Sequence, residues 1–146
     1  MGSTGSARDT AGAMSQENAE LIRRSHDAFN RRDLDAFLEF FDPEVEFTTR
    51  FASLEGDPQY HGHDGIREWW EDLLAIFPDF RSEVLEVRDS GDRGITALRV
   101  RGHGLDSGTP VDEMVWQAWE ARDGKALWWR TLGSEEEALE AAGLSE

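Results

Sequence analysis

The sequence contains no cysteine and few basic residues, and both shortages narrow what the protein can be. Without cysteine there is no disulfide, no thiolate metal site and no cysteine nucleophile, which fits a reducing compartment. Lys and Arg number 15 against 31 Asp and Glu, giving a formal net charge of −16. No basic run interrupts this excess, and so acidic a chain repels a phosphate backbone, so nucleic acid is not an expected partner.

Long hydrophobic runs are also missing. The longest apolar stretches fall far short of the ~18 residues that a membrane span needs, and the N-terminus lacks the apolar core of a signal peptide. We therefore expect a soluble, cytoplasmic protein with no membrane partner. The sequence has neither a glycine-rich phosphate loop nor a serine elbow, so no nucleotide, flavin or other cofactor is expected.

The chain of 146 residues has the length of a single domain. Residues 1–14 are small and polar without periodicity, and we expect them to form a disordered tail, either native or added before Met14. Residues 15–146 are then expected to fold as one domain, without internal repeats.

Local patterns predict helices first and a run of strands afterwards. Ser15, Asp33, Asp64 and Ser134 are the expected N-caps, and Gly143 suits a helix C-terminus. The predicted helices are residues 15–31, 34–42, 65–77 and 135–142, and the predicted strands are residues 45–51, 80–88, 95–105, 111–121 and 126–132, with a short pairing segment around Tyr60. This order predicts an α+β domain whose antiparallel sheet is covered on one face by the three longer helices.

The strand "ITALRVRGHG", residues 95–104, leaves its orientation open. Side chains alternate along a strand, so Leu98 and Val100 point to one face and Arg99, Arg101 and His103 to the other. Alternation alone favours burying the apolar pair, because arginine is seldom fully buried. The opposite orientation would place a basic row inside the protein.

Four segments carry a resemblance to a known family: "LIRRSHDAFNRRDLDAFLEFFDPEVEF", "YHGHDGIREWW", "GHGLDSGTPVDE" and "RDGKALWWR". With this order of elements, they resemble the nuclear transport factor 2-like superfamily, and within it the SnoaL-like proteins related to polyketide cyclases. The resemblance covers roughly residues 16–144. It implies a cone-shaped barrel in which a strongly bent antiparallel sheet wraps around the N-terminal helices and encloses a pocket. It does not fix an activity, because the superfamily contains isomerases, hydrolases, cyclases and proteins that only bind.

The resemblance also implies an orientation for the strands. Matched to the family pattern, the basic row faces the pocket, together with Glu113, Val115 and Gln117 on the next strand and Leu127, Trp129 and Thr131 on the last. The hairpin turn would set Arg101 roughly opposite Glu113. The outer face would then carry an apolar row, and this row implies a homodimer through Leu98, Val100, Met114, Trp116 and Trp128.

Two known chemistries of the superfamily are not retained. In the ketosteroid isomerase pattern, Glu113 matches the oxyanion acid, but Phe47 stands at the base position and Ser25 at the tyrosine position. In the limonene epoxide hydrolase pattern, Arg99 matches the arginine, but Arg101 and Thr131 replace the acids.

The cyclase chemistry needs one general base and neither metal nor cofactor. By the resemblance, His103 in "RGHGL" is the candidate base beside Glu113, with Arg99 or Arg101 holding an enolate oxygen. The remaining predicted substrate contacts are Gln117, Trp129, Phe47, Trp69 and Val115. His61, His63 and Asp64 have metal-ligand types, but no distant ligand completes a set, so no metal is expected.

These observations predict a cofactor-independent SnoaL-like pocket protein. It would bind a small apolar carbonyl, phenol or carboxylate compound, with isomerisation, cyclisation or hydration as the candidate reactions. The alternative is a non-catalytic dimeric module for ligand binding or protein interaction, which the missing isomerase and hydrolase acids favour.

Overall fold

The structure is a computed structural model that describes residues 17–49 and 59–144. An N-terminal helix (residues 17–30) and α2 (Leu34–Leu38) are followed by β1 (Phe41–Thr48), β2 (Gln59–His61) and α3 (Gly62–Ile76). Four long strands come next and a last helix closes the chain: β3 (Arg81–Ser90), β4 (Arg93–His103), β5 (Pro110–Arg122), β6 (Lys125–Leu132) and α4 (Glu135–Ala142). The predicted cap at Ser15 and the predicted tail lie outside the described residues.

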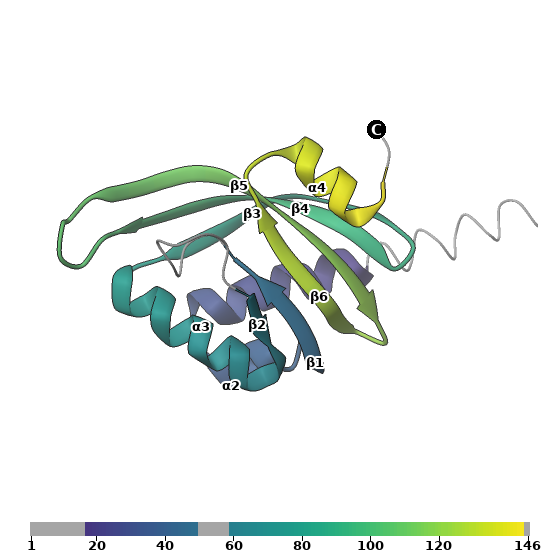
Figure 1. Ribbon diagram of the computed structural model, residues 1–146, viewed down its shortest axis with the longest axis horizontal. Coiled ribbons are helices and arrows are strands. Elements are labelled where there is room, and N and C mark those ends of the chain that lie inside the picture. The colour runs from purple at the N-terminus through teal and green to yellow at the C-terminus, as the bar shows by residue number, and fades with distance from the viewer. Residues whose placement is uncertain (1–16, 50–58, 145–146) are drawn as a thin grey trace, which may run out of the picture.

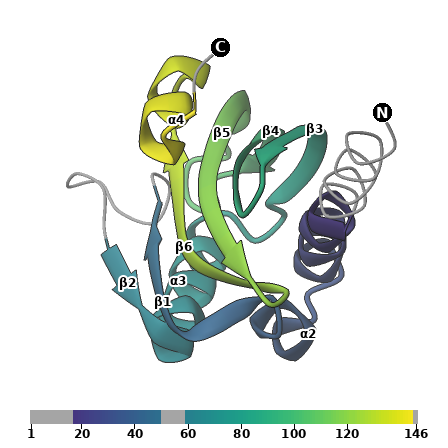
Figure 2. The same ribbon diagram turned by 90° about the vertical axis from the view of Figure 1, so that its right-hand side faces the viewer.

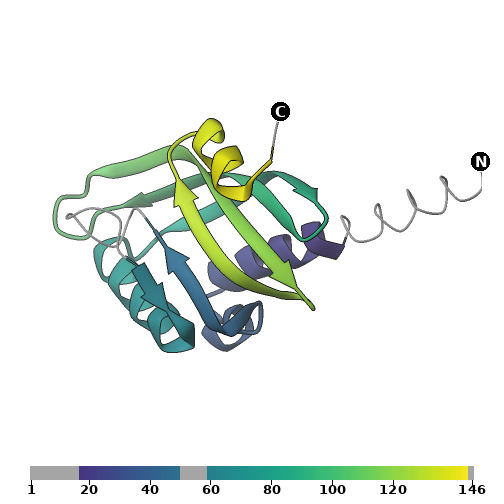
Figure 3. The same ribbon diagram turned by 45° about the vertical axis from the view of Figure 1, so that its right-hand side comes forward.

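The six strands form one strongly curved sheet in the order β2-β1-β6-β5-β4-β3. The sheet arches over the N-terminal helix, α2 and α3, while α4 lies on the opposite, outer face (Figure 1). Turning the molecule shows the N-terminal helix beside the edge strand β3 (Figure 2) and the bend of β5 and β6 over the helices (Figure 3). The predicted α+β cone is thus confirmed.

The sheet is mixed, which corrects the prediction that it is antiparallel. β1 pairs with β6 in the parallel direction, and the other neighbours are antiparallel. β1 also begins at Phe41, before the predicted start at Val45, and so includes Pro43. The pairing register shifts between Phe41 and Glu46, and such an irregularity lets a strand accommodate proline, which cannot donate to the ladder.

The predicted N-caps are confirmed at two of the three described positions, and Gly143 ends α4 with a φ of +70° as predicted. The Asp33 side chain accepts from the Ala36 N–H, and Ser134 accepts from the Glu137 N–H. Asp64 is not a cap, because α3 begins at Gly62 and Asp64 lies in its first turn. Gly62 has a φ of +71°, and a Cβ there would lie 2.9 Å from the Pro43 carbonyl oxygen, so this early start depends on glycine.

The hydrophobic core is divided by the sheet into two parts. The larger part lies between the helices and the concave face, and it includes Phe29, Phe41, Ile66, Leu98 and Trp129. The smaller part lies under α4 on the outer face, where Ile95, Ala118 and Leu139 are buried and Trp116, Trp128 and Leu132 pack against them. A good share of the apolar outer face is therefore covered by the chain's own last helix.

No helix in the described ranges is both long and apolar enough to cross a membrane.

Candidate functional site

The register of β4 against β5 decides which residues face the interior. Leu98 pairs with Val115, and Arg99 pairs with Met114. Directly opposed residues of an antiparallel pair share a face. Leu98, Val100 and Val115 are each at most 2% exposed, so they form the concave wall.

The predicted inward placement of Arg99, Arg101 and His103 is therefore wrong. All three are exposed, and Leu98 and Val100 occupy the interior instead of the outer face. The alternation of the strand alone indicated the correct orientation, because burying a guanidinium is costly and burying Leu or Val is favourable. For β5 and β6 the predicted orientation is right: Val115, Gln117, Trp129 and Thr131 are buried, and Met114, Trp116 and Trp128 face outward.

The predicted pairing of the basic row with Glu113 is wrong as well. Arg101 lies opposite Asp112 rather than Glu113, and its ion pair is with Glu83 at 3.2 Å. Glu113 lies opposite Val100 and is exposed.

His103 has a different acidic partner from the one predicted. Its Nδ1 is 2.8 Å from an Asp79 carboxylate oxygen, and its backbone N–H donates to the other oxygen at 2.7 Å. These two hydrogen bonds, with the side-chain bond the stronger cause, lower the pKa of Asp79. The structure therefore does not bring His103 and Glu113 together as an acid and base pair.

The other predicted contacts do come together, around a small cavity between the concave face and the helices. Its volume is about 40 Å³, and its wall includes Phe47, Trp69, Val115, Gln117 and Trp129. On the scale of about 10–15 Å³ for one water, it has room for a few waters. The lining is mainly apolar and includes several aromatic rings, with the Phe47 and Trp69 ring centroids 4.7 Å apart.

A buried polar group that sequence reasoning missed closes one end of this cavity. His26 Nδ1 lies 2.7 Å from the Ser82 hydroxyl oxygen, and His26 Nε2 lies 3.1 Å from Gln117 Oε1. Because the Gln117 oxygen can only accept, Nε2 carries the proton, and Nδ1 then accepts from the Ser82 hydroxyl. A detectable signal was present in the sequence: His26 lies four residues after Ile22 and three before Phe29, on the apolar face of the helix.

Burial determines the charge of this imidazole. Removal from water lowers the pKa of His26 from 6.5 to about 4, and the hydrogen bond to Gln117 opposes this only in part. His26 is therefore neutral at neutral pH.

Asn30 fixes the strand that supplies Ser82. The Asn30 side-chain amide donates to the Ser82 carbonyl at 2.8 Å and accepts from the Ser82 N–H at 3.1 Å. The free edge of β3 is thereby paired with the N-terminal helix at this residue, which holds the Ser82 hydroxyl toward His26.

Trp69, which lines the cavity, has an unpaired hydrogen-bond donor. Its side chain is 8% exposed, and its indole Nε1 is the only buried side-chain polar atom without a hydrogen-bond partner in residues 17–49 and 59–144. An unmade hydrogen bond of this kind costs about 1–3 kcal/mol, so an acceptor in the cavity would be stabilised.

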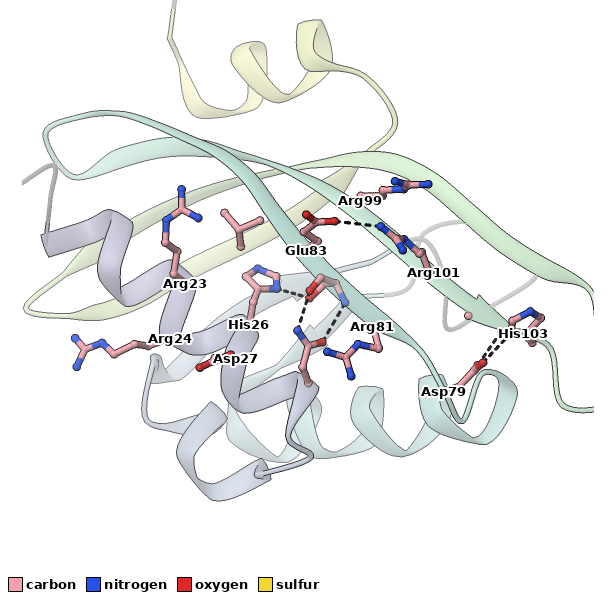
Figure 4. A pocket seen from close by; sticks show the side chains of 14 residues that line it. Arg23, Arg24, His26, Asp27, Asp79, Arg81, Glu83, Arg99, Arg101 and His103 are labelled. Carbon is pink, nitrogen blue, oxygen red and sulfur yellow. Dashed lines mark hydrogen bonds and ion pairs between the residues drawn. The ribbon is translucent and has the colours of Figure 1, made fainter.

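A second and larger hollow lies outside, between the N-terminal helix and β3–β4. It encloses about 780 Å³, and its lining is mostly charged (Figure 4). His26 and Ser82 belong to the lining of both hollows, so they separate the interior cavity from the surface groove.

Comparison with known proteins agrees with this architecture. Residues 22–129 match the SnoaL-like domain family, and the chain belongs to that family. No curated protein matches the chain.

Solved structures with the same fold include three informative cases. A nuclear transport factor 2-like protein of unknown function from Burkholderia pseudomallei K96243 is 23% identical, with a TM-score of 0.73 over 86% of this chain and 97% of the other. TerC, co-crystallised with polyporic acid, is 25% identical, with a TM-score of 0.71 over 86% and 97%. A SnoaL-like polyketide cyclase, so assigned provisionally, from Jannaschia sp. CCS1 is 19% identical, with a TM-score of 0.70 over 88% and 92%.

Proposed function

We propose that this protein is a cofactor-independent SnoaL-like binding protein for a small, largely apolar molecule that carries a carbonyl, phenol or carboxylate oxygen. The observation that carries the proposal is the unpaired indole N–H of Trp69, a residue that lines this cavity. A ligand oxygen that accepts this hydrogen bond relieves the cost of the buried donor, while the aromatic lining contacts the apolar part. Support comes also from the similar protein TerC, which was co-crystallised with polyporic acid.

The chemistry that the cavity supports is narrow. Among its described lining residues there is no carboxylate, and His26 is the sole imidazole. A base whose conjugate acid has a pKa of about 4 removes a proton efficiently only from an acidic substrate, such as a carbon between two carbonyl groups. Cyclisation or isomerisation in this cavity therefore requires a substrate of that kind, with His26 as its base.

Fluorescence titration tests the binding proposal. We expect saturable changes in tryptophan emission with at least one class from a panel of enones, epoxides, polycyclic phenols and aromatic acids. Replacement Trp69→Phe, which removes the donor and keeps most of the ring, should weaken that binding by about tenfold. The control Trp128→Phe makes the same change on the outer face and should leave the affinity unaltered. Absence of binding by every class, or equal losses in both variants, contradicts the proposal.

The small volume of the cavity favours a second candidate, a dimeric module without turnover. A ligand of more than a few heavy atoms enters only if lining side chains move. On the outer face Met114 remains 46% exposed, whereas Trp116 and Trp128 pack against the cluster under α4. We propose this uncovered part of the outer face as the homodimer contact.

Met114→Glu tests the dimer without disturbing α4. We expect light scattering after size-exclusion chromatography to give the mass of a dimer for the unmodified protein and of a monomer for Met114→Glu. Leu105→Glu, at a residue 66% exposed in the β4–β5 turn, is the matched control and should remain dimeric. An unmodified protein with the mass of a monomer would exclude this candidate.

A further inference from the structure

The surface groove concentrates positive charge in a chain that is otherwise strongly acidic. Five of the 15 basic residues line it, namely Arg23, Arg24, Arg81, Arg99 and Arg101, against the three acids Asp27, Asp79 and Glu83. In Figure 4 Arg81 lies near the N-terminal helix, and Arg101 extends from β4 toward Glu83. With a net charge of −16, a chain has no general reason to gather cations in one hollow.

Several of these charges are already neutralised. Arg99 makes two parallel hydrogen bonds to Asp112, both of 2.8 Å, so its charge is paired. Asp79 is held by His103, so it is not available to the arginines of the groove. Arg101 has a single contact, to Glu83 at 3.2 Å, which leaves most of its donors free.

Arg81 has no such partner. Its side chain makes no hydrogen bond or ion pair with any residue in the described part of the chain. Instead, the register places it directly opposite Arg101 on the adjacent strand. Like charges directly opposite each other destabilise a sheet.

A third arginine adds to the repulsion. Arg32 donates to the backbone carbonyls of Phe29, Pro78 and Phe80, so its guanidinium is fixed in place. Burial, and after it the positive charge of Arg81, lowers the pKa of Arg32. The charge of Asp79 opposes this lowering of the Arg32 pKa only in part, so the positive charge of Arg81 is felt by a neighbouring guanidinium.

We propose that Arg81 and Arg101 form a binding site for an oxyanion, the phosphate or carboxylate group of a ligand, in the groove between the N-terminal helix and β3–β4. A guanidinium presents paired donors that match two oxygens of such a group. An anion in the groove would pair with donors that are still free, because the Arg81 side chain has no partner in the described part of the chain and Arg101 has a single one. Because His26 and Ser82 separate the groove from the interior cavity, the site does not require that cavity to open.

Isothermal titration calorimetry with inorganic phosphate and, separately, with benzoate at low ionic strength tests this site. We expect at least one of the two anions to bind, and the one that binds more tightly shows whether a phosphate or a carboxylate group is preferred. Arg81→Gln should weaken the binding by about tenfold, as expected for the loss of a charged hydrogen-bond donor. Arg67→Gln, at an exposed arginine of α3 outside the groove, changes the net charge equally and should weaken the binding much less than Arg81→Gln, because Arg67 is not part of the groove lining.

Glu83→Gln should change the affinity for the anion in the opposite direction. It removes the carboxylate that competes for Arg101, so the anion should bind severalfold more tightly. Thermal unfolding of each variant shows whether the fold is retained. Absence of binding by both anions, equal losses in Arg81→Gln and Arg67→Gln, or unchanged affinity in Glu83→Gln would overturn the proposal. Since Trp69→Phe leaves this site intact, failure here is distinguishable from failure of the interior cavity to bind its ligand.

Discussion

The hydroxyl oxygen of Ser82 lies 2.7 Å from Nδ1 of His26, although the two residues are 56 positions apart in the chain. This contact joins the N-terminal helix to the edge strand β3 and places a neutral imidazole at the boundary between the interior cavity and the surface groove. A polar group buried to this extent is tolerated because both ring nitrogens are hydrogen-bonded.

His26 should make the stability of the protein depend on pH. Its folded pKa, about 4, lies below its ordinary value of 6.5, so the unfolded chain binds the proton more tightly. The stabilisation is fully present above pH 6.5 and is lost as the pH falls from 6.5 toward 4, to a total of about 3 kcal/mol at roughly 1.4 kcal/mol per pKa unit. Urea unfolding at a series of pH values measures this loss.

The variant His26→Gln should show a flatter dependence over the same range. His61→Gln, which changes an exposed histidine, should keep the slope of the unmodified protein. Identical slopes for His26→Gln and the unmodified protein would mean that His26 is not responsible.

Ser82→Ala removes the hydroxyl that donates to His26 Nδ1 and leaves a buried acceptor unsatisfied. We expect the free energy of unfolding to fall by about 1–3 kcal/mol. Ser90→Ala, at the exposed end of the same strand, should change it by less than about 0.5 kcal/mol. Chemical denaturation compares the two variants, and equal effects would argue against a structural role for the hydrogen bond.

Gly94→Ala should disrupt the packing of β4 on β5. A Cβ at this position would lie 2.6 Å from both the Arg88 carbonyl oxygen and a ring carbon of Trp119, closer than any van der Waals contact allows. We expect a loss of about 1–3 kcal/mol or more. At Gly102 the nearest atom would be 3.2 Å away, so Gly102→Ala should lower the stability less. Thermal unfolding of the two variants measures the difference, and equal losses would contradict the prediction.

Ser134→Ala should loosen α4 from the outer face. The Ser134 hydroxyl accepts from the Glu137 N–H, and losing such a cap costs about 1 kcal/mol. Because Trp116 and Trp128 pack against the cluster beneath α4, near-ultraviolet circular dichroism should report the change along with stability. Ser134→Asn restores a capping oxygen and should recover most of the lost stability. If Ser134→Asn is as unstable as Ser134→Ala, the missing cap is not the cause of the loss.

Much of the fold could be predicted from local sequence because local physical chemistry sets it. The alternation of Leu98 and Val100 with Arg99 and Arg101, the capping box at Ser134 and the turn signals between strands each depend on neighbours along the chain. They indicate the strands β3 to β6 and the helix α4 close to their observed bounds. The parallel pairing of β1 with β6 has no local signal, since the strands are brought together by the intervening elements.

The candidate site was predicted less well from the sequence than the fold was. Phe47, Trp69, Val115, Gln117 and Trp129 were predicted together and do surround one cavity. The orientation of β4 went wrong because a side-chain period of two reverses both faces when the assumed register is off by one residue. The resemblance to the family placed the arginines of β4 inside. The alternation of the strand itself favoured burying Leu98 and Val100, as observed.

The sequence by itself determined the class of domain, the caps at Asp33 and Ser134 and most of the apolar residues that fill the interior, because these follow from composition, periodicity and neighbouring side chains. Only the tertiary structure decided that His26 meets Ser82 and Gln117, that the indole of Trp69 lacks an acceptor, and that Arg81 faces Arg101. These relationships join residues distant in the chain, and the pairing register and the packing of helix against sheet create them.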